Sequence, residues 1–454
     1  MHRHAPLALG ATLLTLAVPT SALAEWTTPE TVALPQGAVG TLSGYGDGAA
    51  VGHGYINLVG AVRRTGTTIN PPFTTQIGDA YEHSVSVEQS GSGQLTALAR
   101  RQRPRLPFRV RATLVSADGA TKIGPFTLSP SKRSAVNPVL SVARDGTAIA
   151  AWAYRDSATT GWYVQAAVRK PGQTRFAPAQ ALSAAPTTEI ASRPEIRVSA
   201  GNGGHAAVTW FYPSLDYTAA APTDVPLIVR TSSQDGGFTE PQAFTGFGSR
   251  PGVSMAYSPS GAELTLGLAR SGNDSTHQTA TVAVTVGASG SPLPAPVQLS
   301  AGGEGFAAPP ALAYGADGSE VLGWIQPSNL NGPGGKLLVA TRSAGGVFGA
   351  LEPLASVPEN PEYLRVAAGP GGKAVLAWER YVRPLPAKYG TTPLYSVYAS
   401  VRADAASPFG PAEQISTDGD SVSNPDIVVT DNGDTVAAFK TWDNSRYEMT
   451  LLKH

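Results

Sequence analysis

The sequence contains no cysteine. Disulfides, thiolate metal sites and acylation at a cysteine are therefore excluded, and the fold must be held by its hydrophobic core. Charge is sparse and balanced, because only 15% of the residues are charged and the formal net charge is zero. The overall charge predicts no nucleic-acid partner, and only a local cluster of charge could select a charged ligand.

Long apolar runs are also missing, apart from one near the start. Residues 7–18 are apolar, follow a short basic segment and precede the small-residue end Ala22-Leu23-Ala24. This pattern is typical of a secretory signal peptide cleaved after Ala24, and the run is shorter than the ~20 residues that span a bilayer. We expect a secreted, extracellular or periplasmic chain without membrane insertion, with a signal peptide over residues 1–24 and one domain over 25–454.

Helical periodicity is scarce, whereas glycine (50 residues) and proline (38 residues) are abundant. The chain instead repeats one unit, which is clearest over residues 137–152: an apolar strand, an Asp-Gly turn and a second strand that ends at Trp152. The aromatic residue at this end is expected to fill the space between neighbouring units. The turn glycine recurs roughly every 55 residues, at Gly48, Gly93, Gly146, Gly204, Gly261, Gly318, Gly372 and Gly433.

Each unit continues with two further short strands, so four antiparallel strands repeat about eight times. This is the pattern of β-propeller blades, whereas tandem sandwiches would need seven or more strands per ~100 residues. The last unit ends after three strands, and residues 26–32 match a fourth. We predict an all-β fold: a single β-propeller of about eight four-stranded blades, with seven the alternative, closed by the N-terminal strand completing the last blade.

One turn, at residues 233–239, has a sequence similar to a turn motif of a known propeller family. Residues 233–239 have the sequence Ser-Gln-Asp-Gly-Gly-Phe-Thr. They resemble the S-x-D-x-G-x-T Asp-box between the third and fourth strands of secreted sialidase-like (BNR-type) repeat propellers. The resemblance implies that Ser233, Asp235, Gly237 and Thr239 serve folding, remote from any active site. It does not extend to sialidase chemistry, because the Arg-Ile-Pro motif of the first catalytic arginine is absent and sialidases have six blades.

Sequence motifs for cofactors and catalytic nucleophiles are absent. The chain has no H-E-x-x-H, no histidine pair at ligand spacing and no G-x-S-x-G, so neither a zinc site nor a serine-hydrolase elbow is expected. Acid-rich turns at 418–420 and 431–434 could offer oxygen atoms to calcium. Aspartate and asparagine are, however, ordinary residues of glycine-containing turns. We expect no cofactor and no metal. If these acid-rich turns bound an ion, it would be calcium.

The candidate site residues lie in second-to-third-strand loops and in the connections between blades, which share one face of a propeller. They combine arginine with aromatic residues, which suits sugars bearing carboxylates or sulfates. Four of the arginines, at positions 100–105, crowd one segment without an acid among them. The predicted ligand-binding residues are Arg100, Arg101, Arg103, Arg105, Tyr154, Arg155, Trp162, Arg193, Tyr217, Arg250, Arg380, Tyr381 and Arg383.

We interpret the chain as an exported, monomeric binding module for an anionic glycan or a cell-surface polymer. One alternative is a glycan-active enzyme, a divergent sialidase or a polysaccharide lyase, that uses Asp156, Asp216 or Glu379 as its acid. A third is a structural or adhesive scaffold without a small ligand. Carboxylates close together on the face that carries these loops would favour the enzyme. Arginine and tyrosine side chains on that face, with no acidic side chain among them, would favour binding. The sequence favours binding over catalysis.

Overall fold

The structure is a computed structural model, and the part of the chain that it describes is almost entirely β-strand. It describes residues 26–454 except 28–29, 34–38, 46–47, 56–57, 66–67, 78–81, 103–105, 131–133, 156–160, 184–191, 214–223, 271–278, 301–302, 305–307, 328–334, 355–360, 385–392, 417–420 and 444–445. Two 3₁₀ turns, η1 (Asn202–Gly204) and η2 (Pro370–Gly372), interrupt the strands. Over these residues, no helix has the length and apolar character needed to cross a membrane.

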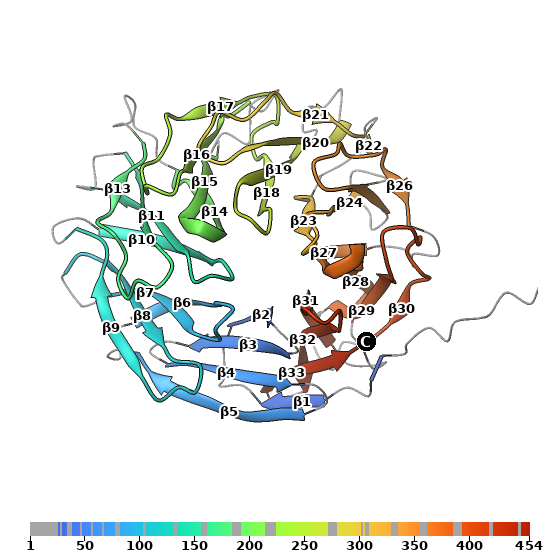
Figure 1. Cartoon of the computed structure of the whole chain (residues 1–454), viewed down its shortest axis with the longest axis horizontal. Helices are drawn as coiled ribbons and strands as arrows, with labels where there is room; N and C mark the ends of the chain where they lie inside the picture. Colours follow the sequence, from blue (N-terminus) through green and yellow to red (C-terminus); the bar gives the residue numbers. More distant parts are fainter. Residues whose placement is uncertain are drawn as a thin grey trace, which may run out of the picture.

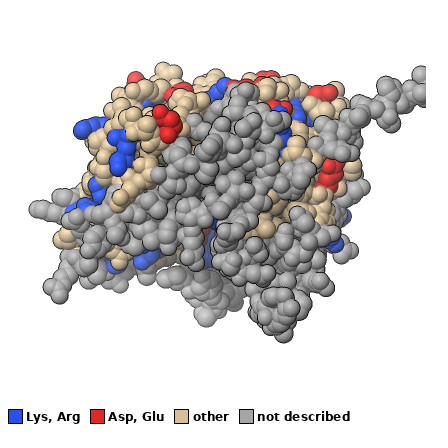
Figure 2. All heavy atoms as spheres, turned by 90° about the horizontal axis from the view of Figure 1, so that it is seen from below, with Lys and Arg blue, Asp and Glu red and all other residues tan. Residues whose placement is uncertain are grey.

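The strands of the described residues form eight antiparallel sheets, seven of four strands and one of five. Figure 1 shows them arranged as blades in a ring around a central axis, with the first strand of each blade nearest the axis. This confirms the predicted all-β propeller and its count of eight blades. On the side of the ring shown in Figure 2, basic and acidic side chains are interspersed among uncharged ones.

The first four blades follow one another along the chain. They consist of β2 (Val39–Tyr45), β3 (Gly48–Tyr55), β4 (Leu58–Thr65) and β5 (Thr68–Gln76) in blade 1; β6 (Glu82–Gln89), β7 (Leu95–Arg101), β8 (Arg109–Val115) and β9 (Lys122–Thr127) in blade 2; β10 (Ser134–Val142), β11 (Ala148–Arg155), β12 (Tyr163–Arg169) and β13 (Gln180–Ala181) in blade 3; and β14 (Glu195–Gly201), β15 (His205–Phe211), β16 (Leu227–Ser232) and β17 (Gln242–Phe244) in blade 4.

The last four blades continue the series, and the final one takes its outer strand from the start of the chain. They consist of β18 (Gly252–Tyr257), β19 (Glu263–Arg270), β20 (Thr279–Ala288), β21 (Val297–Gln298) and β22 (Gly303–Glu304) in blade 5; β23 (Ala311–Tyr314), β24 (Glu320–Pro327), β25 (Gly335–Arg342) and β26 (Glu352–Pro353) in blade 6; β27 (Pro361–Ala368), β28 (Ala374–Pro384), β29 (Pro393–Arg402) and β30 (Glu413–Gln414) in blade 7; and β31 (Ser421–Val429), β32 (Thr435–Asp443), β33 (Arg446–Lys453) and β1 (Glu30–Ala33) in blade 8.

The ring is closed by the strand that the sequence assigned to this task. β1 pairs with β33, with Glu30 opposite Leu451 and Ala33 opposite Glu448. Before β1, the Thr27 N–H donates to the Lys453 carbonyl over 2.8 Å. Inner strands β2 and β31 also touch, so blades 1 and 8 are neighbours. The prediction that the N-terminal strand completes the last blade is therefore confirmed.

The antiparallel order gives the ring two different faces. Hairpins between first and second strands share one face with the turns between third and fourth strands, and we call it the turn face. The opposite face carries the second-to-third-strand loops and the connections between blades, and we call it the connection face. On the turn face, Gly146 and Gly433 occupy the hairpin turns with φ of 90° and 88°, which glycine adopts without steric cost.

The tryptophan at the end of the second strand packs between blades, as the repeat predicted. Trp152, Trp324 and Trp378 are fully buried. Trp378 of blade 7 lies against Val321 and Leu337 of blade 6, and the other two contact the preceding blade in the same way. Most of their other neighbours are alanine, valine and leucine, so the blades can stack closely and bury a continuous apolar core.

The fourth strands of blades 3, 5, 6 and 7 have only two residues each and are shorter than the sequence suggested. In blade 3 the apolar segment beginning at Phe176 predicted a strand, but only Gln180–Ala181 pair as β13. Pro178 lies in this segment and cannot donate a hydrogen bond to the ladder. Single hydrogen bonds on either side, from the N–H of Ala177 and of Leu182, hold the rest of the segment against β12.

Candidate functional site

Several of the predicted site residues meet on the connection face of blades 3 and 4. Arg155 ends β11, Trp162 directly precedes β12, and Arg193 lies in the connection before β14. The guanidinium carbons of Arg155 and Arg193 lie 4.7 and 5.3 Å from the centre of the Trp162 ring. These distances are typical of cation–π contacts. The tryptophan therefore positions two arginines that are far apart in the sequence.

Trp162 itself is a buried residue, with 4% of its surface exposed. Its carbonyl accepts a hydrogen bond of 2.7 Å from the Tyr212 hydroxyl, and burial raises the pKa of that tyrosine. Tyr154 is equally buried and stacks on Tyr163 at 5.1 Å. The expectation that Trp162 and Tyr154 offer open ring faces to a sugar is therefore corrected: both rings are buried, with Trp162 beneath the two arginines and Tyr154 stacked on Tyr163.

A cavity of about 530 Å³ opens beside this stack, where the first strands of blades 3, 4 and 5 begin. Three exposed arginines line it, and we call it the arginine cavity: Arg193, Arg197 and Arg250. Arg197 lies within β14 and donates only to the neighbouring Ile196 carbonyl, over 3.3 Å. Among the described residues that line the same cavity, Glu195 is the one acid. The wall thus carries an excess of positive charge within a chain of zero net charge.

The start of β10 forms the far wall of the arginine cavity. A β-bulge interrupts the pairing of β10 with β11 between Val136 and Val139. Within it, Asn137 has a φ of 50°, which is uncommon for a residue other than glycine. Bulges of this kind turn side chains away from the sheet and often lie beside functional sites. Here the bulge brings Asn137 into the wall of the cavity.

A second group of polar side chains lies at the same end of blade 7. Glu362 in β27 and Glu379 in β28 are paired across the two strands. Tyr395 in β29 lies near both carboxylates, and its ring meets that of Tyr381 edge to face at 5.8 Å. Burial, together with the nearby glutamates, raises the pKa of Tyr395 to about 12. Burial also raises the pKa of Glu362. We call these four residues the glutamate–tyrosine cluster.

Glu379, a predicted catalytic acid, is therefore a buried member of a carboxylate pair, with 2% of its surface exposed. Its neighbour Arg380 points to the other side of the strand, where its Nη1 donates to the Tyr398 hydroxyl over 3.3 Å. Tyr398 in turn stacks on the buried Trp378, at 6.2 Å between ring centres. Arg380 is thus anchored to the core, whereas Tyr381 belongs to the glutamate–tyrosine cluster.

The position of the first predicted arginines requires a correction. Arg100 and Arg101 lie inside β7, not in the loop that follows it. The guanidinium carbon of Arg100 lies 5.1 Å from the centre of the Phe108 ring. Arg101 is paired across the sheet with Glu82 in β6. The two arginines therefore belong to the sheet of blade 2 and not to the expected loop cluster.

Other predicted residues lie outside the described part of the chain or only partly within it. The residues outside are Arg103, Arg105, Asp156, Asp216 and Tyr217. For Arg383 the structure describes the backbone, which belongs to β28, but not the side chain. Their proposed roles stay predictions from the sequence.

The motif resembling an Asp-box forms the turn between β16 and β17, on the turn face. The Gly236 N–H donates to the Ser233 carbonyl over 2.9 Å, and Thr239 pairs with Thr231. The Gly236 carbonyl accepts from Gln180 of blade 3 over 2.7 Å. The turn therefore links two blades, on the face opposite the arginine cavity.

The acid-rich turn considered for calcium is engaged by cations of the chain itself. Asp431 forms an ion pair with Arg144 of blade 3, and Asp434 accepts from Lys453 over 2.7 Å. Across the residues the structure describes, no group of three or more acidic or histidine side chains is placed to hold a metal ion.

Sequence reasoning missed Arg197, Glu362 and Tyr395. The position of Glu362 could have been predicted from the repeat, because Pro361-Glu362 repeats the Pro194-Glu195 dipeptide at the start of a first strand. Arg197 could have been found from the alternation of polar and apolar residues along β14, which puts it on the same side as Glu195.

The chain matches no known family model and no curated protein. Among solved structures it is similar to the polysaccharide lyase Uly1, with a TM-score of 0.45 and 9% identity over 93% of this chain and 90% of that one. The NanB sialidase from Streptococcus pneumoniae has a TM-score of 0.38 and 10% identity, with coverages of 89% and 83%. The β-propeller domain of the trilobed protease from Pyrococcus furiosus has a TM-score of 0.42 and 9% identity, with coverages of 81% and 97%. These likenesses are distant and concern the course of the chain alone.

Proposed function

We propose that this chain is an exported ligand-binding module that holds an anionic glycan or a cell-surface polymer on its connection face. The arginine cavity carries this proposal, because three exposed guanidinium groups line one hollow whose described lining includes a single acid. Planar guanidinium groups bind carboxylate and sulfate through paired hydrogen bonds. Arg155 and Trp162 extend the cationic wall and keep Arg193 in place. A polymer with an acidic group on successive sugars could engage several arginines at once.

Retention on columns of heparin and of polygalacturonate tests whether such a polymer is bound. The protein without residues 1–24 should be retained at low salt and released as salt rises, because screening weakens exposed charge pairs. A variant with Arg193→Gln, Arg197→Gln and Arg250→Gln should leave both columns at markedly lower salt.

The matched control removes three positive charges elsewhere. Lys122, Lys170 and Arg175 lie at or beside third-to-fourth-strand turns, on the turn face. Replacing all three by Gln lowers the net charge by the same amount and should change retention little. Equal loss of retention in the two triple variants would mean that only overall charge matters, and the proposed site would be wrong. If the unaltered protein is not retained on either column, the scaffold interpretation takes its place.

A second function, a glycan-active enzyme, is favoured by the glutamate–tyrosine cluster. Two neighbouring carboxylates are the usual groups for acid and base steps at a glycosidic bond, and Glu362 has a raised pKa suited to proton donation. The test is release of new chain ends from polygalacturonate and from sialylated glycans. Release that disappears in both Glu362→Gln and Glu379→Gln would support the enzyme. Absence of release, or release that survives both changes, would exclude this cluster as its catalytic site.

A further inference from the structure

An arginine recurs at the end of the third strand in three blades. Arg169 ends β12, Arg342 ends β25 and Arg402 ends β29, and each is buried. Each guanidinium covers the ring of a phenylalanine in the segment that follows. The distances to the ring centres are 5.7 Å for Arg169 on Phe176, 5.6 Å for Arg342 on Phe348 and 5.4 Å for Arg402 on Phe409. The shared contact is structural, since it holds the third-to-fourth-strand segment against the sheet.

The three arginines differ in how their remaining N–H groups are used. Arg342 is paired with two acids: its Nε donates to Glu320 over 2.7 Å and its Nη2 to Glu263. Arg169 directs both its Nε and its Nη2 to the Gly146 carbonyl, over 3.3 and 3.0 Å. Arg342 thus has two carboxylate acceptors, whereas Arg169 has one carbonyl, and its Nη1 has no partner among the described residues.

Arg402, like Arg169, bonds to a single carbonyl. It is 6% exposed, and its Nε donates to the Gly372 carbonyl over 3.1 Å. In the described part of the chain, nothing accepts a hydrogen bond from its Nη atoms. The two acids that influence its charge, Asp317 and Asp404, each accept hydrogen bonds within their own turns. Burial lowers the pKa of Arg402, and the nearby Asp317 and Asp404 act in the opposite direction.

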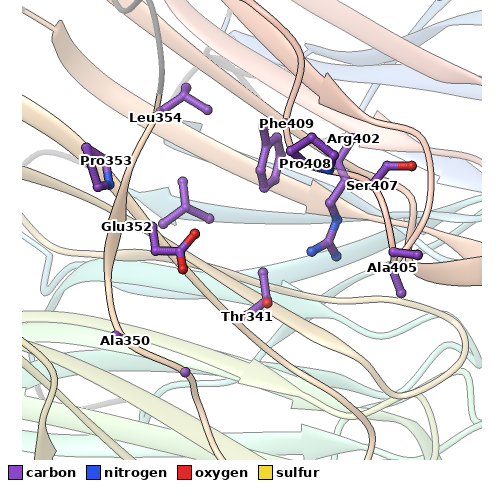
Figure 3. A pocket seen from close by; sticks show the side chains of 13 residues that line it. Thr341, Ala350, Glu352, Pro353, Leu354, Arg402, Ala405, Ser407, Pro408 and Phe409 are labelled. Carbon is purple, nitrogen blue, oxygen red and sulfur yellow. The ribbon is translucent and has the colours of Figure 1, made fainter. Parts of the chain in front are cut away.

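The Nη atoms of Arg402 line a pocket of about 470 Å³ between blades 6 and 7, which we call the interblade pocket. Figure 3 shows the Arg402 guanidinium and the Glu352 carboxylate pointing toward one another from opposite walls, with Thr341 between them. No ion pair joins Glu352 to Arg402 among the described side chains. The remaining wall is largely apolar and consists of Pro353, Leu354, Pro408 and Phe409.

We propose that the interblade pocket binds a compact carboxylate that also carries a hydroxyl or ammonium donor. The ligand carboxylate accepts paired hydrogen bonds from the Nη atoms of Arg402, as the planar fork of arginine favours. The donor of the ligand faces Glu352, and its carbon frame lies against the proline and phenylalanine wall. Uronic acids and α-amino acids share this chemistry, and both fit the volume of the pocket.

Two opposed charges make the pocket selective. A neutral sugar offers no carboxylate to Arg402, and a simple fatty carboxylate offers no donor to Glu352. Hydrogen bonds to charged groups are worth more than neutral ones, so each defect should lower affinity about tenfold or more. The site is separate from the arginine cavity, since the two occupy different blades and opposite faces of the ring.

Ligand-observed NMR with four probes tests the proposal. Galacturonate and serine carry a carboxylate with a donor, galactose lacks the carboxylate, and propionate lacks the donor. We expect saturation transfer to galacturonate or serine, and whichever is stronger identifies the source of the ligand. Galactose and propionate should bind about tenfold more weakly or not at all. Failure of both galacturonate and serine to bind, or equal binding of galactose, would overturn the proposal.

Three variants locate the site. Arg402→Gln should abolish binding of the preferred probe, and Glu352→Gln, a change at an exposed side chain, should weaken it severalfold while leaving the fold intact. Arg169→Gln removes the equivalent buried arginine of blade 3 and controls for loosening of the sheet. Binding should survive that change. Retained binding in both Arg402→Gln and Glu352→Gln, or its loss in Arg169→Gln alone, would contradict the assignment.

Discussion

Glu320 shows how a single buried carboxylate can make stability depend on pH. Its side chain is fully buried at the start of β24, where it accepts from Arg342 over 2.7 Å and from the Thr265 hydroxyl over 2.8 Å. Burial raises its pKa to about 7, although Arg342 acts in the opposite direction. Loss of solvation therefore outweighs the ion pair. The folded chain binds this proton more tightly than the unfolded chain, in which the pKa is near 4.5.

The contribution of Glu320 to stability should accordingly fall as pH rises from about 4.5 to about 7. Glu320→Gln cannot ionise, so only the unaltered protein should lose this contribution. The gap in melting temperature, unaltered protein minus Glu320→Gln, should fall by a few degrees between pH 5 and pH 8. The measurement is a series of thermal unfolding curves, with the exposed Glu352→Gln as a control that shows no such trend. A gap that widens with pH would mean that Arg342 keeps the carboxylate ionised.

Single residues were also where sequence reasoning was least complete. The sequence identified Arg155, Trp162, Arg193 and Arg250 as site residues, and the structure brings the first three into one stack. It could not show that Trp162 is buried, because exposure depends on packing between blades. The pairing of Arg101 with Glu82 likewise follows from strand register, which no local pattern gives.

Among the strands, β1 closes the ring by pairing with β33. It covers the free edge of β33, and Trp26 ahead of it packs on the core of blade 8 and lies 5.1 Å from the His454 ring. Deleting residues 25–34 removes this strand and leaves the edge unpaired. We expect a large drop in melting temperature or aggregation, because exposed strand edges pair with other chains.

A synthetic peptide of residues 25–34 provides the control for this deletion. Added in excess, it should restore part of the lost stability, since binding to the folded state alone raises the melting temperature. An unchanged melting temperature after deletion would show that β1 contributes little to closure. Lack of rescue by the peptide would point to a general defect of the shortened chain.

The repeat explains why the number and order of the strands were predicted better than their bulges and lengths. Turn glycines recur in every unit and second-strand aromatics in most of them, so hairpins and the blade count followed from the sequence. Bulges did not, because Asn137 and Tyr363 take positive φ only where the first strand slips against the second. The two-residue fourth strands were also overestimated, since apolar residues continue beyond the last ladder hydrogen bond.

On the scale of the whole molecule, the two faces have different chemistry. The turn face is tied together around the ring: Asp145 and Asn202 bond neighbouring hairpins of blades 3 and 4, and Asn202 donates to the Pro259 carbonyl of blade 5. The connection face carries the arginine cavity and the glutamate–tyrosine cluster. The turn face thus links neighbouring blades by hydrogen bonds, and the connection face carries the exposed arginines of the cavity.

Titration of a galacturonate oligosaccharide into the protein without residues 1–24, at low and at high salt, tests the central claim most directly. We predict binding at low salt that weakens as salt is added. The Arg193→Gln, Arg197→Gln, Arg250→Gln variant should lose about 1.5 kcal/mol or more of binding free energy, as expected when hydrogen bonds to a charged group are lost. The Lys122→Gln, Lys170→Gln, Arg175→Gln variant should bind like the unaltered protein. Equal affinity of all three proteins, or affinity that does not respond to salt, would contradict the assignment of the arginine cavity as the ligand site.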